Sequence, residues 1–270
     1  NILLPTLHVR PSAQATPLAA ANLKAALPEK DRGKTQLLDL YLSQSLEQML
    51  TAIKQNKPDV VAFPLYLWNR QRVLALAKKL RQWQPDIFLL AGGPEASADA
   101  RRVLAEGGLD AVIRGEGENA FAALISALAE GKSFHDLTGV VTPDSPLSSA
   151  AYCENLDLLP SPYLQKVLLP AAGDGLLWEV ARGCPFDCTF CYDAKGHQGV
   201  RPLPMKRLEK ELKLFVASKT EQVWVLDSTF NFPAERGRSL LRLLLKVAPG
   251  IHYHLEAKVD FIDRETTDLL

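Results

Sequence analysis

Short apolar runs alternate with amphipathic stretches along residues 1–142, and this alternation predicts a parallel β-sheet wrapped by helices. The apolar runs predict strands at residues 2–4, 36–40, 59–63, 87–91 and 111–113. The stretches between them predict helices at residues 17–27, 45–56, 70–83, 98–106 and 119–130. We therefore expect a doubly wound, Rossmann-like α/β domain with the flavodoxin-type strand order 2-1-3-4-5.

The same alternation resumes near residue 176. It predicts strands at residues 176–181, 222–226 and 251–255, with helices at 204–216 and 235–246. Both periodicities are broken over residues 143–175, where prolines and glycines cluster. We therefore expect one domain at 1–142, a linker at 143–175 that acts as a rigid spacer, and a second α/β domain at 176–270. The chain opens inside an expected strand and closes on a newly started helix, so we expect the natural protein to continue beyond Leu270.

Four turns of the first domain follow expected strands. In a doubly wound sheet, ligands bind at the carboxyl ends of the strands, beside the switch point between the first and third strands. The candidate ligand contacts at these turns are Thr6, Leu7 and His8; Tyr66, Leu67, Trp68 and Asn69; Gly92, Gly93, Pro94 and Glu95; and Gly115, Glu116, Gly117 and Glu118. The paired glycines after the fourth strand remove Cβ atoms where a large flat ligand would meet backbone, and Tyr66, Leu67 and Trp68 offer an apolar platform. No glycine-rich phosphate motif follows any strand, which favours a bulky and mostly apolar ligand.

Composition narrows the class of protein. The 270 residues are 47% hydrophobic and carry 31 basic against 31 acidic side chains. This balance gives no electrostatic case for nucleic acid or a membrane surface as a partner. No apolar stretch approaches the roughly 18 residues of a membrane span, so we expect a soluble, cytoplasmic protein.

Three of the four cysteines lie within eight residues. Cys184, Cys188 and Cys191 form a C-x3-C-x2-C pattern directly after an expected strand, whereas Cys153 is isolated and reads as a small linker residue. Metal ligation in a reducing compartment explains this grouping better than disulfides do. Three thiolates without an evident fourth ligand describe a metal centre that is open on one side. The alternatives are a zinc knuckle completed by His197 and a buried cluster of thiols.

The cysteine loop resembles that of the radical S-adenosylmethionine (SAM) enzymes, because an aromatic residue, Phe190, precedes the last cysteine. The resemblance implies a 4Fe-4S cluster held by the three cysteines, with SAM bound at the remaining iron. The turns around Gly93 and Gly115 and the aromatic turn before Asn69 resemble the cobalamin-binding domain of B12-dependent radical SAM proteins. The resemblance therefore implies a cobalamin-binding domain followed by the first part of a partial (β/α)6 barrel.

Further SAM contacts follow from the resemblance to the radical SAM family. It places Asp227 at the methionyl amine and Phe190 near adenine, with Ser228 beside Asp227 at the same strand end. Glu256 and Lys258 end the next strand, within reach of the ribose hydroxyls or the carboxylate of SAM. An ion pair between Glu256 and Lys258 is the alternative for these two residues.

One departure from the family concerns cobalt. Many cobalamin domains carry Asp-x-His-x-x-Gly after the first strand, whereas this chain has Thr6-Leu7-His8-Val9-Arg10-Pro11. The histidine is present without the aspartate that would orient it. In those domains the histidine is a ligand to cobalt. The alternative for His8 is a loop or helix-entry histidine that does not bind cobalt, in which case Leu67 or a neighbour covers the lower face of cobalt.

The resemblance implies reductive cleavage of SAM to a 5'-deoxyadenosyl radical and methylation of an unactivated carbon, or of phosphorus, through methylcobalamin. A small-molecule or peptide substrate and an external electron donor of the flavodoxin or ferredoxin type are the expected partners. Rearrangement or cyclisation with the same cofactors is one alternative. A corrinoid- or metal-binding module without enzymatic activity is the other.

Overall fold

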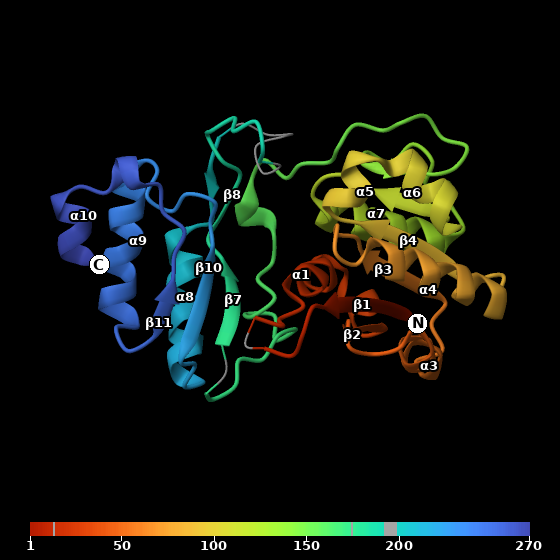
Figure 1. The fold of residues 1–270 in the computed structure, drawn as a ribbon, viewed down its shortest axis with the longest axis horizontal. Helices are drawn as coiled ribbons and strands as arrows, with labels where there is room; N and C mark the ends of the chain where they lie inside the picture. The colour runs from red at the N-terminus through yellow and green to blue at the C-terminus, as the bar shows by residue number, and fades with distance from the viewer. Residues whose placement is uncertain (13, 174, 192–198) are drawn as a thin grey trace. The chain divides into compact units, whose positions relative to one another are not determined.

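The computed structural model describes residues 1–12, 14–173, 175–191 and 199–270, which form two compact units (Figure 1). Unit 1 comprises Asn1–Pro11 and Pro17–Cys153, and unit 2 comprises Ser12–Thr16 and Glu154–Leu270. Among the described residues, no helix is both long and apolar enough to cross a membrane.

Unit 1 is built on one mixed sheet. Within the described residues its strand order is β2-β1-β3-β4-β5-β6, which confirms the predicted 2-1-3-4-5 arrangement and adds one strand at the edge. The strands are β1 (Ile2–His8), β2 (Thr35–Tyr41), β3 (Val60–Pro64), β4 (Phe88–Gly92), β5 (Ala111–Ile113) and β6 (Val140–Val141). All pair in parallel except β5 with β6, which is antiparallel. The strand β6 was not predicted, because two residues are too few to show a periodicity.

Helices cover both faces of this sheet (Figure 1). They are α1 (Leu18–Ala26), α2 (Glu29–Arg32), α3 (Leu46–Gln55), α4 (Arg70–Trp83), α5 (Pro94–Ala98), α6 (Ala100–Gly107) and α7 (Gly117–Glu130). One buried cluster joins α3, α4 and α6 to one face, and a second joins α1 and α7 to the other. The helix predicted at 98–106 corresponds to α6, which starts later because Asp99 leaves the helical conformation and caps it by accepting a hydrogen bond from the Arg102 N–H. The short helix α5 before it was not predicted.

Unit 2 contains a parallel sheet in the order β11-β10-β7, made of β7 (Gly175–Glu179), β10 (Gln222–Leu226) and β11 (His252–His254). The strand predicted at 176–181 is interrupted at Val180, and β8 (Ala181–Arg182) then pairs antiparallel with β9 (Arg201–Pro202). The helices of this unit are α8 (Met205–Ala217), α9 (Ala234–Val247) and α10 (Arg264–Leu269). The predicted strand–helix units are therefore present, with the carboxyl ends of the parallel strands at one edge.

The segment that follows Cys153 packs on unit 2. The buried ring of Tyr163 meets Phe215 of α8 edge to face at a centroid distance of 4.9 Å, and its hydroxyl donates to the carbonyl of Leu177. Arg207 donates to the carbonyl of Leu159 over 2.8 Å. Burial, and secondarily the charge of Glu211, raises the pKa of Tyr163. The proline-rich segment thus contributes side chains to the core of unit 2.

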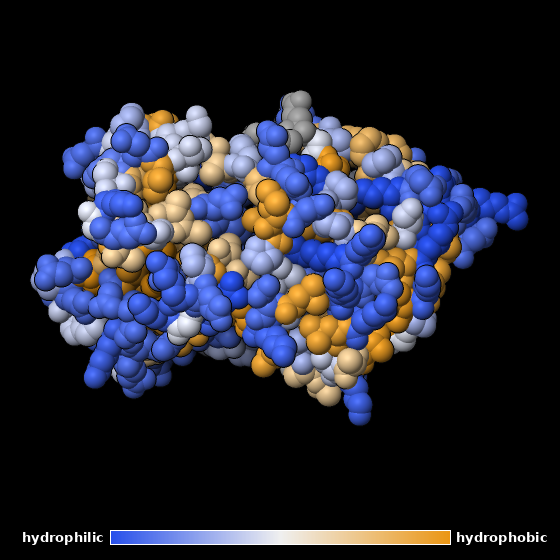
Figure 2. Space-filling model, turned by 180° about the vertical axis from the view of Figure 1, so that it is seen from behind, coloured by the Kyte–Doolittle hydropathy of each residue, from blue (hydrophilic) through white to orange (hydrophobic). Residues whose placement is uncertain are grey.

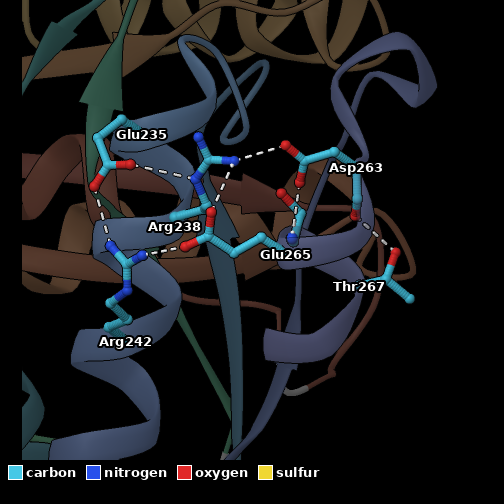
Figure 3. Close-up of polar contacts among 7 residues, drawn as sticks. Glu235, Arg238, Arg242, Asp263, Glu265 and Thr267 are labelled. Atoms are coloured by element: carbon cyan, nitrogen blue, oxygen red, sulfur yellow. Dashed lines mark hydrogen bonds and ion pairs between the residues drawn. The ribbon is translucent and has the colours of Figure 1, made fainter.

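The last helix is fastened by charged side chains (Figure 3). Asp263 caps α10 by accepting a 2.9 Å hydrogen bond from the Thr266 N–H. Arg238 of α9 donates to Asp263 over 2.6 Å, and Arg242 pairs with both Glu235 and Glu265. The helix expected at the end of the chain is confirmed, and these pairs hold it beside α9. On the face of the molecule seen in Figure 2, hydrophobic residues surface as separate patches among hydrophilic ones.

Candidate functional site

The turn after β3 is braced by a buried asparagine. The Oδ1 atom of Asn69 accepts a 2.8 Å hydrogen bond from the Tyr66 N–H, and its Nδ2 donates to the carbonyl of Pro64 over 2.9 Å. Both ends of this side-chain amide are therefore used within the turn. Asn69 shapes the predicted platform, and its burial keeps it off the outer surface.

The platform itself is apolar and faces solvent. The rings of Tyr66 and Trp68 stack at a centroid distance of 4.4 Å and an interplanar angle of 10°. Leu67 is 80% exposed and Trp68 is 54% exposed. Burial of Tyr66 raises its pKa. Exposed apolar side chains on a braced turn suit contact with a large, mostly apolar ligand.

The glycines at the end of β4 are packed against the protein's own backbone. Gly93 has a φ of 99°, and a Cβ there would lie 2.9 Å from the carbonyl oxygen of Leu65. That oxygen also accepts a hydrogen bond from the N–H of Glu95, whose carboxylate pairs with Arg70 at 3.0 Å. Gly93 is therefore required by the preceding turn, whose backbone fills the space that a Cβ would take. Gly92 ends β4 and Pro94 opens α5.

The turn after β5 is equally tied to its own unit. Gly115 has a φ of 83°, and a Cβ there would lie 2.2 Å from the carbonyl oxygen of Ala151. The carboxylate of Glu116 accepts a 2.7 Å hydrogen bond from the N–H of Cys153. Gly117 opens α7, and Glu118 is buried in its first turn. This turn therefore anchors the segment at residues 151–153.

The first predicted binding turn is in fact strand. Thr6, Leu7 and His8 lie in β1, which pairs with β2 from Ile2 to His8 without a break. Leu7 is buried in the core of unit 1. The apolar run ends at Leu4, which is why the sequence placed the end of the strand too early.

His8 has an aspartate partner that the sequence analysis missed. Its Nε2 lies 2.8 Å from Oδ1 of Asp39, and its ring lies 5.6 Å from that of Tyr41. His8 pairs with Tyr41 in register, and Asp39 stands two residues earlier on the same face of β2. A lone acidic residue within an apolar strand was the signal that could have found it.

The cysteine loop leaves the end of β8 and returns at β9, so a short antiparallel ladder closes its base. Gly183 starts the loop with a φ of 84°, a conformation that favours glycine. Cys184 is buried, Cys188 is exposed and Cys191 is half-buried, and all three are free thiols. The N–H of Cys191 donates to the carbonyl of Cys188 over 3.0 Å.

The donor set fits an iron–sulfur cluster, since three soft thiols stand on one loop at the edge where parallel strands end. Within the described part of the chain, no three His, Cys, Asp or Glu side chains are close enough together to hold a metal ion. Cluster binding would therefore require the three cysteine side chains to come closer together. His197, the alternative fourth ligand, lies outside the described residues.

Three aromatic rings fasten the cysteine loop to the neighbouring strand ends. Phe186 of the loop lies 5.4 Å from Phe232, which follows β10, and 5.9 Å from Phe261, which follows β11. The ammonium of Lys258 sits 5.0 Å from the centre of the Phe186 ring and pairs with Asp260. The hydrogen bond from Lys258 lowers the pKa of Asp260. The alternative ion pair of Lys258 with Glu256 is wrong, because the partner is Asp260.

Asp227, at the end of β10, is buried against an arginine. Its carboxylate accepts hydrogen bonds from Arg236 over 2.5 and 3.2 Å and from the Thr229 N–H over 3.1 Å. A carboxylate has about four lone-pair sites, so these bonds leave room for one more donor. Arg236 could not be predicted from the sequence, because its approach to Asp227 depends on how α9 packs.

Asn231 links the turns after β10 and β11 through two hydrogen bonds. Its Nδ2 donates to the carbonyl of Lys258 over 2.8 Å, and its Oδ1 accepts from the Lys258 N–H over 3.0 Å. Of the other predicted SAM contacts, Phe190 is 91% exposed, Glu256 is exposed and Ser228 is half-buried. The structure thus brings the cysteine loop and the ends of β10 and β11 together at one edge of unit 2.

Comparison with known proteins supports both parts of this arrangement. A B12 binding domain model matches residues 9–125, and a radical SAM superfamily model matches residues 178–270. The hopanoid C-3 methylase of Methylococcus capsulatus is 30% identical over 238 residues, which are 85% of this chain and 45% of that protein. The cobalamin-dependent radical SAM methyltransferase TokK of Streptomyces tokunonensis is 29% identical over 207 residues, 71% of this chain and 30% of that protein. The chain thus spans less than half the length of these relatives.

A solved structure extends the comparison to the fold. The radical SAM methyltransferase TsrM from Kitasatospora setae, with cobalamin and a [4Fe-4S] cluster bound, matches with a TM-score of 0.73 and 16% identity. The match covers 99% of this chain and 56% of TsrM. It confirms the predicted fold class, a doubly wound domain followed by the start of a barrel. With a B12-binding domain and a radical SAM domain in sequence, the chain belongs to the cobalamin-dependent radical SAM family.

Proposed function

We propose that this protein is a cobalamin-dependent radical SAM methyltransferase that methylates an unactivated carbon or phosphorus of a small molecule or peptide. The observation that carries the proposal is the set of three free cysteines, Cys184, Cys188 and Cys191, at the carboxyl edge of parallel strands behind a B12-binding domain. The named functions of the methylase relatives support methyl transfer as the reaction.

The bound cofactors supply the bond-breaking chemistry, namely one-electron cleavage of SAM and carriage of the methyl group. In unit 2 the three cysteines hold the 4Fe-4S cluster. Phe190, which is exposed, and Ser228, which is half-buried, contact SAM. Glu256 contacts the ribose hydroxyls or the carboxylate of SAM. Asp227 keeps acceptor capacity for the methionyl amine, and Arg236 holds its orientation. Lys258 contributes positive charge at the same edge.

In unit 1 the exposed turn at Leu67 and Trp68 is the proposed contact with cobalamin. Leu67 suits the lower face of cobalt, because a side chain that is apolar and 80% exposed offers no ligand atom yet excludes water. The remaining candidates of the turns after β4 and β5 stay predictions. A flavodoxin- or ferredoxin-type protein is the proposed electron donor, and free cysteines favour the reducing cytoplasm as the location.

Anaerobic reconstitution tests the proposal. With iron, sulfide and hydroxocobalamin supplied, we expect about four irons per chain, corrinoid absorbance that survives desalting, and cleavage of SAM to 5'-deoxyadenosine. Labelled SAM should also pass its methyl group to the corrinoid, which separates a methyltransferase from a cyclase or a rearranging enzyme. Cys188→Ser should lose iron and keep the corrinoid, whereas Cys153→Ser should keep both. Bound zinc without SAM cleavage would overturn the proposal.

A further inference from the structure

A buried hydroxyl lies beside the first cluster cysteine. The Oγ1 atom of Thr229 is 3.8 Å from Sγ of Cys184, within hydrogen-bond reach of sulfur. Thr229 is 4% exposed and Cys184 is 9% exposed, so water does not compete strongly for this contact. The same hydroxyl lies 2.6 Å from the carbonyl of Ser228, to which it can donate its single hydrogen.

The direction of the contact depends on the state of the sulfur. A thiol has a proton to donate, so Cys184 can donate to Thr229 while Thr229 donates to Ser228. A metal-bound cysteine is a thiolate, which only accepts. The hydroxyl hydrogen of Thr229 rotates freely about its C–O bond, and with the thiolate present it gains a charged acceptor.

Thr229 is held in place through its backbone. Its N–H donates to Oδ1 of Asp227 over 3.1 Å, and its carbonyl accepts from Arg236 over 2.7 Å. Arg236 also forms two hydrogen bonds with the Asp227 carboxylate. The ion pair of buried Asp227 with half-buried Arg236 therefore fixes both polar groups of the Thr229 backbone.

Close packing of α9 makes this bracing possible. A Cβ at Gly237 would lie 2.7 Å from Cα of Asn231 and 3.0 Å from the carbonyl oxygen of Phe230. Gly237 thus lets the first turn of α9 lie directly on the segment that follows β10. Arg236, the neighbouring residue, reaches Asp227 and Thr229 from that position.

We propose, on the basis of the function proposed above, that Thr229 donates a hydrogen bond to the Cys184 thiolate of the bound cluster and raises its reduction potential. A reduced cluster carries one more negative charge than the oxidised cluster. A donor to a cluster sulfur therefore stabilises the reduced form more, and hydrogen bonds to the sulfurs are among the factors that set such potentials. Asp227 and Arg236 act as positioning residues for this donor.

The test is a potentiometric titration of the anaerobically reconstituted protein, with the reduced cluster followed by electron paramagnetic resonance. Thr229→Val removes the hydroxyl at nearly constant shape, and we expect a more negative midpoint potential. Thr229→Ser keeps the donor and should retain the wild-type potential. Thr220→Val is the matched control, because the buried hydroxyl of Thr220 has no hydrogen-bond partner among the described residues.

The outcomes are separable from those that test the function. Unchanged potentials in loaded Thr229→Val would overturn the inference and leave the function standing. A wild-type protein that takes up no cluster would instead overturn the function. Reduced loading of Thr229→Val does not block the test, because the signal comes only from loaded protein. A second readout is the exchangeable deuteron coupled to the cluster in heavy water, which Thr229→Val should lose and Thr229→Ser should keep.

Discussion

The Nε2 atom of His8 forms a 2.8 Å hydrogen bond with Oδ1 of Asp39. The side chain of His8 is largely buried, and the partner reaches it from the neighbouring strand. A neutral imidazole that donates from one nitrogen has only the other nitrogen left as a metal ligand. The nitrogen bound to Asp39 is therefore not available to cobalt in this structure.

We predict that cobalamin binds without His8 as a ligand, because the His8 side chain is only 9% exposed where it lies in β1. His8→Ala should change the apparent Kd for hydroxocobalamin by less than about tenfold, the lower end of the loss seen when support of a metal ligand is removed. Electron paramagnetic resonance of the cob(II)alamin form should show no splitting from a histidine nitrogen.

Asp39→Asn is the matched control, because it keeps the size of the partner of His8 and removes its charge. It too should retain cobalamin. A histidine splitting in the wild-type spectrum that disappears in His8→Ala would contradict the prediction.

The second prediction concerns the two phenylalanines of the cysteine loop. Phe186 contacts Phe232 and Phe261, and each aromatic pair contributes roughly 0.5–1.5 kcal/mol beyond the area that it buries. Phe186→Ala should therefore weaken the ordering of the loop by about 1–3 kcal/mol. Faster hydrogen exchange at the loop and a lower iron content after reconstitution would show this loss.

Phe190 provides the comparison on the same loop. It is 91% exposed, so Phe190→Ala should leave hydrogen exchange and iron content unchanged and lower only the affinity for SAM. Equal iron loss in the two variants would mean that the aromatic contacts of Phe186 do not order the loop.

The helices, the strands and the cysteine loop can be predicted from the sequence, because all of them depend on local spacing. The positions of most strands and the C-x3-C-x2-C loop follow from periodicity and residue type alone. The end of β1 does not, because Pro5 and Thr6 interrupt the apolar run while pairing with β2 continues. Hydrophobic pattern reports burial, and strand pairing depends on the neighbouring backbone as well.

Side-chain partners are the part that the sequence does not reveal. Arg236 and Thr229 look like a helix-surface residue and a turn residue until α9 is packed against the turn after β10. The backbone packed beside a glycine is equally hidden in the sequence. An added Cβ would meet the carbonyl of Leu65 at Gly93 and that of Ala151 at Gly115. Which atom fills the space beside a glycine is a property of the folded chain.

Gly115 should be far less tolerant of alanine than Gly131. Both have positive φ, which costs an L-residue roughly 1–2 kcal/mol. At Gly115 the added Cβ would also lie 2.2 Å from the carbonyl oxygen of Ala151, which adds about 1–3 kcal/mol of overpacking. At Gly131 no atom lies within 4 Å of the added Cβ.

Urea unfolding of the two variants checks this difference. We expect Gly115→Ala to lose roughly 2–5 kcal/mol and Gly131→Ala about 1–2 kcal/mol. Equal losses would show that the segment at Ala151 yields easily. The turn after β5 would then not anchor that segment as the structure indicates.

Glu211 is the buried carboxylate on which we expect unit 2 to depend most. Glu211 lies in α8 and is buried against β7. It accepts a 2.7 Å hydrogen bond from Nε1 of Trp178 and a 3.0 Å hydrogen bond from Arg207. Removing one partner of a buried ion pair leaves the other charge uncompensated, which typically costs about 3–5 kcal/mol. Glu211→Ala should therefore lower the free energy of unfolding by that amount. Glu211→Gln should lose less, because it still accepts from Trp178.

Glu209, on the same helix, is the control for this effect. It pairs with Lys213 at the surface, where solvent screens the charges, so Glu209→Ala should leave the unfolding curve unchanged. The measurement is equilibrium urea unfolding of all three variants, followed by tryptophan fluorescence. A Glu211→Ala curve that overlays the Glu209→Ala curve would show that the core relaxes around Arg207. In that case the arginine reaches water once its partner is gone, and the pair does not limit the stability of unit 2.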